Sequence, residues 1–127
     1  MKSVAKHVIC FILVQALLGC VTNRSNDIGK NLTCDQHAKV AAYLNNWAIN
    51  NFSESYGKKG DVNGANVQLF LISERAPSPY AAAFNRYQEK ALENITLAKR
   101  KGCNTVDYPL PPVDEFRHQL EIARSGK

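Results

Sequence analysis

Apolar residues recur at steps of three and four in three stretches of this chain, which is the spacing of an α-helix that buries one face. The first stretch predicts a helix over residues 34–51, with apolar positions at Cys34, Ala38, Ala41, Leu44, Ala48 and Phe52. The second predicts a helix over residues 79–101, whose apolar face comprises Tyr80, Phe84, Tyr87, Ala91, Ile95 and Ala98. The third predicts a short helix over residues 113–124, with an apolar face of Val113, Phe116, Leu120 and Ala123.

Capping residues support the ends of the two long helices. Thr33 followed by Gln36 matches a capping box, in which each side chain binds a free backbone N–H of the first turn. Ser78 before Pro79 places a polar cap ahead of a proline at the first helical position. Gly102 suits the left-handed residue that ends many helices.

The region between the long helices is harder to interpret. Residues 53–64 contain Gly57, Gly60 and Gly64, and we predict a loop there, the longest of the chain. Residues 66–73 are apolar at both odd and even positions, so a helix and a strand both remain open, and the lack of a strand partner favours a helix. The pattern as a whole predicts an all-α fold, a small bundle of three to four helices formed by a single domain over residues 33–127.

A basic start and an apolar run precede this domain. The apolar segment, residues 7–18, is too short to span a hydrocarbon core of ~30 Å as a helix. It ends in Leu17-Leu18-Gly19-Cys20, which resembles the lipobox of bacterial lipoproteins. Ordinary secretory cleavage is the alternative, but it prefers a small residue where Leu17 stands.

The lipobox resemblance has several implications. Residues 1–19 would be a lipoprotein signal peptide, and Cys20 would become the first residue of the mature chain and carry lipid, including an amide-linked acyl group such as palmitate. Residues 20–32, polar and without a period, would form a flexible tether behind this membrane anchor. Val21, which is not aspartate, favours the outer membrane and a domain facing the periplasm.

The four cysteines then divide by role. Cys10 would leave with the signal peptide and Cys20 would carry lipid, so only Cys34 and Cys103 remain to pair. An exported compartment lets disulfides persist. If the helices over residues 34–51 and 79–101 pack antiparallel, Cys34 and Cys103 lie at the same end of the bundle. Metal binding or thiol chemistry would need further ligands or a Cys-x-x-Cys motif, and the sequence has neither.

Little in the sequence points to chemistry. Without Lys2 and Lys6 the mature chain has 14 basic and 11 acidic residues, too small and scattered an excess for nucleic acid. We expect His37 and His118 to be solvated, because the single Glu115-x-x-His118 motif is too little for a metal site in a bundle. No catalytic motif or cofactor fingerprint occurs, so we expect a protein that is not an enzyme and binds no metal or cofactor.

These features favour a binding or assembly accessory of the bacterial cell envelope with a protein partner. The layout is similar to that of pilotins, small helical lipoproteins of secretion systems, but no motif matches and no partner-binding residue carries over. A groove between residues 69–72 and the helix over residues 79–101 is one candidate docking site. The competing interpretation, which we favour, is that these residues fill the core. The alternative function is an exclusion, immunity or inhibitor lipoprotein that acts against a toxin, phage or conjugation apparatus through residues 53–64.

Overall fold

The computed structural model describes residues 29–126 and divides the chain into two units, residues 1–31 and 32–127. The predicted signal peptide, Cys10, Cys20 and residues 21–28 of the predicted tether lie outside the described residues. The one described element of the first unit is the 3-10 turn Gly29–Asn31. The second unit contains four α-helices, and its described residues contain no strand, so the predicted all-α fold is confirmed.

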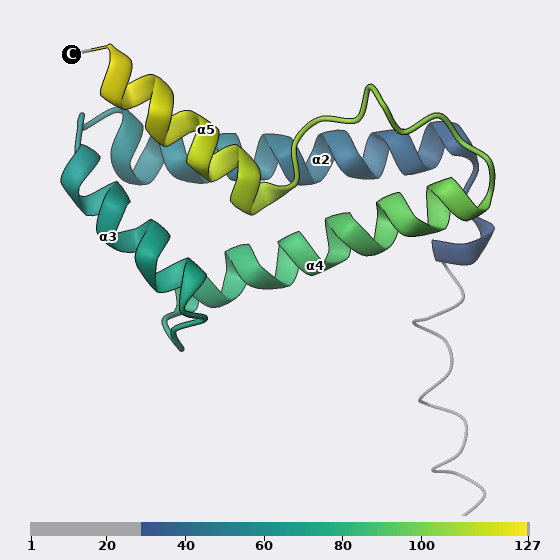
Figure 1. The fold of residues 1–127 in the computed structure, drawn as a ribbon, viewed down its shortest axis with the longest axis horizontal. Helices are drawn as coiled ribbons and strands as arrows, with labels where there is room; N and C mark the ends of the chain where they lie inside the picture. Colours follow the sequence, from purple (N-terminus) through teal and green to yellow (C-terminus); the bar gives the residue numbers. More distant parts are fainter. Residues whose placement is uncertain (1–28, 127) are drawn as a thin grey trace, which may run out of the picture. The chain divides into compact units, whose positions relative to one another are not determined.

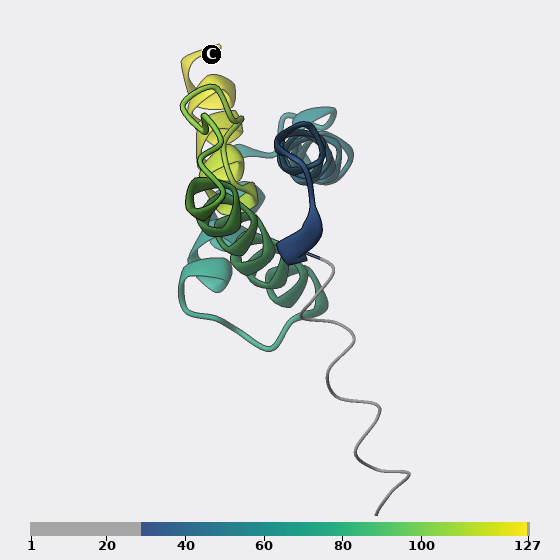
Figure 2. The same cartoon turned by 90° about the vertical axis from the view of Figure 1, so that its right-hand side faces the viewer.

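Two long helices form the frame of this unit. They are α2 (Cys34–Phe52) and α4 (Pro79–Arg100), which pack side by side in opposite directions (Figure 1). α3 (Val62–Ser73) connects them at one end. After α4 an extended connector runs back along the pair to α5 (Pro112–Ser125), which covers the half of the pair nearer α3. Figure 2 looks nearly along α2 and shows α4 and α5 together on one side of it.

The predicted caps lie where the sequence placed them. The Gln36 backbone N–H donates to Thr33 Oγ1 at 3.2 Å, and the Thr33 N–H donates to Gln36 Oε1 at 2.8 Å. Ser78 accepts from the Ala81 N–H at 3.3 Å at the start of α4, and Gly102 follows that helix with φ of 84°. The segment over residues 66–73, left open between helix and strand, is helical.

The predicted loop over residues 53–64 is largely wrong, because only residues 58–61 form a non-helical link. α2 continues through a π-helical turn, Ser53–Gly57, and α3 begins at Val62, four residues before the predicted start. Gly64 lies inside the first turn of α3, where the Asp61 side chain caps its N–H at 2.9 Å. A Cβ at this position would stand 2.2 Å from Asp61 Oδ2. The glycine therefore makes room for a helix cap, and its presence had suggested a loop.

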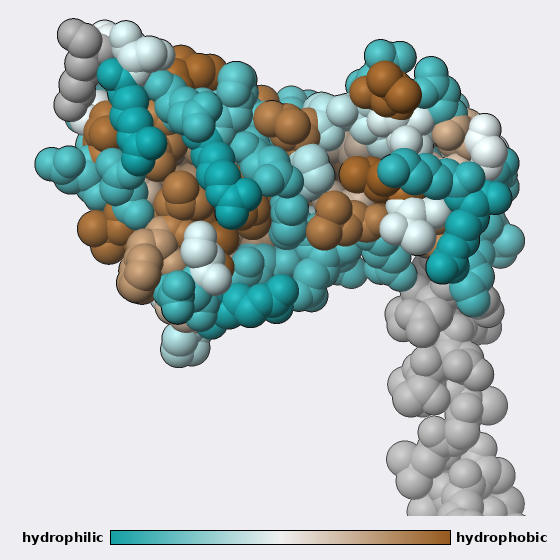
Figure 3. All heavy atoms as spheres, in the orientation of Figure 1, coloured by the Kyte–Doolittle hydropathy of each residue, from teal (hydrophilic) through white to brown (hydrophobic). Residues whose placement is uncertain are grey.

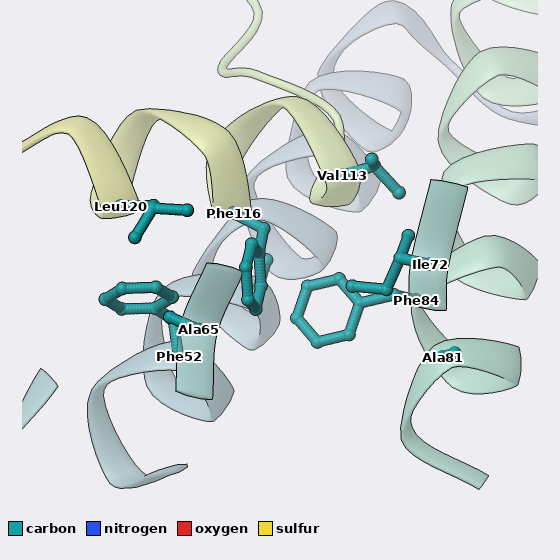
Figure 4. Close-up of a cluster of buried hydrophobic side chains, with 9 residues drawn as sticks. Phe52, Ala65, Ile72, Ala81, Phe84, Val113, Phe116 and Leu120 are labelled. Atoms are coloured by element: carbon teal, nitrogen blue, oxygen red, sulfur yellow. The ribbon is translucent and has the colours of Figure 1, made fainter. Parts of the chain in front are cut away.

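Aromatic side chains from α2, α4 and α5 form the centre of the core. Phe116 of α5 lies between Phe52 and Phe84, with ring centroids 5.0 and 5.3 Å apart in edge-to-face geometry (Figure 4). Burying one such side chain stabilises a fold by roughly 1.5–3 kcal/mol. Small residues bring the two long helices close together, since helix separation depends on the side chains at the contact. The buried alanines of these two helices are Ala41, Ala48, Ala81, Ala91 and Ala98.

The predicted disulfide between Cys34 and Cys103 is present. It joins the first residue of α2 to the segment just after α4, across a sequence separation of 69 residues. The two Cα atoms are 5.4 Å apart, so the antiparallel packing of α2 and α4 places both cysteines at one end, as expected. We call this end of the unit, which comprises residues 34–39 and 99–107, the disulfide end.

Candidate partner-docking surface

α3 is apolar on its outward side as well as on its inward side. Its inward residues Ala65 and Ile72 are buried, and Leu69 and Leu71 are half-buried against the core. On the outward side Val67 and Phe70 are 60% and 62% exposed. A helix that is apolar all round is normally buried on all sides. We call the exposed stripe with helical spacing on this side the outer face of α3; it comprises Asn63, Val67, Phe70 and Glu74.

Polar contacts hold this helix in place from both flanks. Arg124 of α5 donates to Asn66 Oδ1, and Arg75 forms an ion pair with Glu89 of α4 at 3.0 Å. Arg75 itself takes a left-handed conformation, with φ of 53°, where α3 ends. The space-filling view shows apolar surface interrupted by hydrophilic side chains over α3 and α5 (Figure 3). The outer face of α3 therefore carries two exposed apolar side chains, Val67 and Phe70, and has charged neighbours.

Two tyrosines lie between the core and the segment that leads into α3. Tyr56 donates to Gln68 Oε1 of α3 at 3.2 Å, and its ring lies 5.9 Å from that of Tyr80. Burial raises the pKa of Tyr80 to about 12, Tyr56 adds to the rise, and the nearby Ser55 side chain opposes it. Among the described residues the Tyr80 hydroxyl has no hydrogen-bond partner of normal geometry.

The raised pKa of Tyr80 predicts that the protein loses folding stability at alkaline pH and that Tyr80→Phe reduces this loss. Because the folded pKa of about 12 lies above the ordinary 10.0, ionisation of Tyr80 favours the unfolded chain as the pH rises through this window. We expect the wild type to lose stability more steeply than Tyr80→Phe above pH 10, and the two to differ little at neutral pH. Urea unfolding across this pH range measures the effect. Tyr43→Phe is the control, since Tyr43 is 65% exposed, and equal slopes for all three proteins would refute the assignment.

The histidine prediction was half right. His118 is exposed, as expected, but His37 is only 1% exposed and lies between α2 and α4. Its Nδ1 lies 2.6 Å from Asn94 Oδ1, while the Asn94 side-chain amide donates to the His37 carbonyl at 2.9 Å. His37 therefore pairs with Asn94, and the structure does not bring it together with His118 as a ligand pair. At helical spacing His37 lies between Cys34 and Ala41, and Asn94 lies between Ala91 and Ala98. This placement in apolar stripes was the only sequence signal for their burial.

A second buried polar group, also missed by the sequence pattern, joins α5 to α2. The Asn45 side-chain amide donates to Glu115 Oε2 at 2.7 Å and to the carbonyl of Leu110 at 3.0 Å. Gln119 donates to the other carboxylate oxygen at 2.7 Å. Glu115 is 5% exposed and held by amides, so it positions α5 and the connector.

Residues 29–126 contain no group of three His, Cys, Asp or Glu side chains placed to hold a metal ion. None of the helices described is both long and apolar enough to cross a membrane. Comparison with protein-family models, curated proteins and solved structures finds no match to this chain.

Proposed function

We propose that this chain is a small bacterial lipoprotein that presents a helical binding module in the cell envelope, as pilotins do. In this proposal the lipobox-like stretch directs cleavage before Cys20, whose acyl chains hold the protein at the outer membrane facing the periplasm. The module is an assembly or binding accessory and performs no catalysis. The observation that carries the binding role is the outer face of α3, with two large apolar side chains exposed on an otherwise core-packed helix.

The occupant we propose for this face is an amphipathic helix of a protein partner. Val67 and Phe70 are one helical turn apart, which matches the spacing of apolar anchors on such a helix. Glu74 and the paired Arg75 and Glu89 supply both signs of charge at the rim, where ion pairs set orientation more than affinity. The groove at Leu69–Ile72 that the sequence suggested is not the docking site we propose, because most of these side chains pack against the core. The docking face is instead the opposite side of the same helix.

The exclusion, immunity or inhibitor function has less support. It relied on a surface loop over residues 53–64 as the recognition element. That segment is a π-helical turn and a short link into α3, and Tyr56 within it packs against the core. A recognition role for this region would have to use the few exposed side chains of the link.

Substitution of the outer face tests the proposal. We expect Val67→Ser with Phe70→Ser to lower capture of the partner at least tenfold, because buried aromatic anchors dominate binding energy. The readout is a photo-crosslinking residue at position 74, which should give one discrete adduct in intact cells that disappears in the double variant. Both residues are exposed, so stability should change little.

The matched control removes two other large, exposed apolar side chains. Tyr43→Ser with Leu92→Ser alters residues that are 65% and 48% exposed on α2 and α4, and it should leave the adduct intact. Equal loss in both double variants, or an adduct that survives in the outer-face variant, would contradict a docking role for α3.

A further inference from the structure

The disulfide end carries a basic cluster beside the point where the chain enters the helical unit. Lys99 and Arg100 end α4, Lys101 follows directly as its C-cap, and all three are exposed. The Cys34–Cys103 disulfide, with its Cα atoms 5.4 Å apart, ties this end of α4 to the first residue of α2. From the spacing of consecutive Cα atoms, Lys101 therefore lies within about 13 Å of Cys34.

The same end presents an apolar side chain on a structured turn. Val106 is 88% exposed, the largest exposed fraction among the large hydrophobic residues described. Its N–H donates to Asn104 Oδ1 at 3.1 Å, and the Tyr108 N–H donates to the Thr105 carbonyl at 3.3 Å. From the spacing of consecutive Cα atoms, the Cα of Val106 lies within about 11 Å of the Cα of Cys103. Figure 1 shows the connector, the start of α2 and the end of α4 meeting at the right.

Charge is distributed unevenly between this end and the rest of the unit. The disulfide end has four basic side chains and two acidic ones, and one acidic residue, Asp35, is paired with Lys39 at 2.7 Å. The remainder of residues 33–126 has seven basic and eight acidic side chains. The four basic residues are Lys39, Lys99, Arg100 and Lys101, and the two acidic residues are Asp35 and Asp107.

From these observations we infer that the disulfide end docks on an anionic phospholipid surface. The basic side chains contact lipid headgroups, each adding to the attraction near the surface, and Val106 enters the interface. The inference rests on the proposed lipid anchor at Cys20, which would bring the helical unit next to a membrane. The thirteen residues 20–32 reach at most about 45 Å, so the chain holds this end within reach of that membrane.

Docking in this way orients the module. α3 connects α2 and α4 at the end opposite the disulfide, as Figure 1 shows. With the disulfide end on the membrane, the outer face of α3 lies at the far end and is open to a partner in the periplasm. The lipid-contacting end and the docking face then lie at opposite ends of the α2 and α4 pair.

The test uses the mature chain with Cys20→Ser, which carries no lipid, and vesicles of phosphatidylethanolamine and phosphatidylglycerol. We expect co-sedimentation that weakens with salt and is at least tenfold lower with Lys99→Gln, Arg100→Gln and Lys101→Gln combined. Val106→Ser should lower binding several-fold. The control, Lys58→Gln, Lys59→Gln and Lys90→Gln combined, removes the same charge from other exposed positions and should change binding less than twofold.

Four results would overturn the inference. The first three are no binding of the wild type to these vesicles, equal losses in the two triple variants, and equal binding to pure phosphatidylcholine vesicles. The fourth is binding to polyglutamate in preference to vesicles, which would assign the cluster to an acidic polymer. Because the assayed chain has no lipid, these outcomes are independent of whether Cys20 is acylated in cells.

Discussion

Replacing both Cys34 and Cys103 with serine should lower the free energy of unfolding by about 4 kcal/mol. The disulfide closes a loop with a sequence separation of 69 residues, and the chain-entropy model assigns roughly this stabilisation to a loop of that length. For a helical unit of this size, the loss corresponds to a fall in Tm of roughly 15–30 °C. Thermal unfolding followed by circular dichroism, with and without reductant, measures it.

The controls for this prediction use the reductant. Cys34 is exposed, so a reductant should reach the bond in the folded wild type and lower its Tm to that of the double variant. The double variant itself should not respond. Free thiols at positions 34 and 103 in the isolated protein, or a fall in Tm of only a few degrees, would contradict a stabilising disulfide.

Replacing Cys20 with serine should release the protein from membranes completely. Two or more acyl chains make an anchor effectively permanent, because each buried methylene contributes about 0.8 kcal/mol, whereas serine cannot accept the thioether-linked lipid. Fractionation of cells after a high-salt wash gives the readout, since salt removes the weaker electrostatic contacts of the disulfide end. Cys10→Ser is the matched control and should remain in the membrane fraction. Retention of Cys20→Ser would contradict the lipoprotein proposal.

Local signals in the sequence predicted most of the helix ends. Thr33 with Gln36, Ser78 with Pro79 and Gly102 each act within a few residues, so their effect can be recognised without a fold. The disulfide could be predicted because topology placed two cysteines at one end. The start of α3 could not be predicted, since Gly64 leaves room for the Asp61 cap and looks like a loop residue when only spacing is considered.

The candidate site was harder to predict than the fold. The pattern of residues 66–73 is apolar at both odd and even positions. It therefore did not predict which side of the helix faces the core and which faces solvent. That choice depends on how α3 packs against α4 and α5. The buried His37 and Asn94 pair was missed for a related reason, because its two members are 57 residues apart and only helix packing brings them into contact.

The most direct test of the account is the mass of the N-terminal peptide of the mature protein purified from bacterial membranes. We predict a peptide that begins at Cys20 and carries a diacylglyceryl group and an amide-linked acyl chain, with no residue of the leader attached. A peptide that begins elsewhere, or an unmodified Cys20, would contradict the lipid anchor and with it the proposed function.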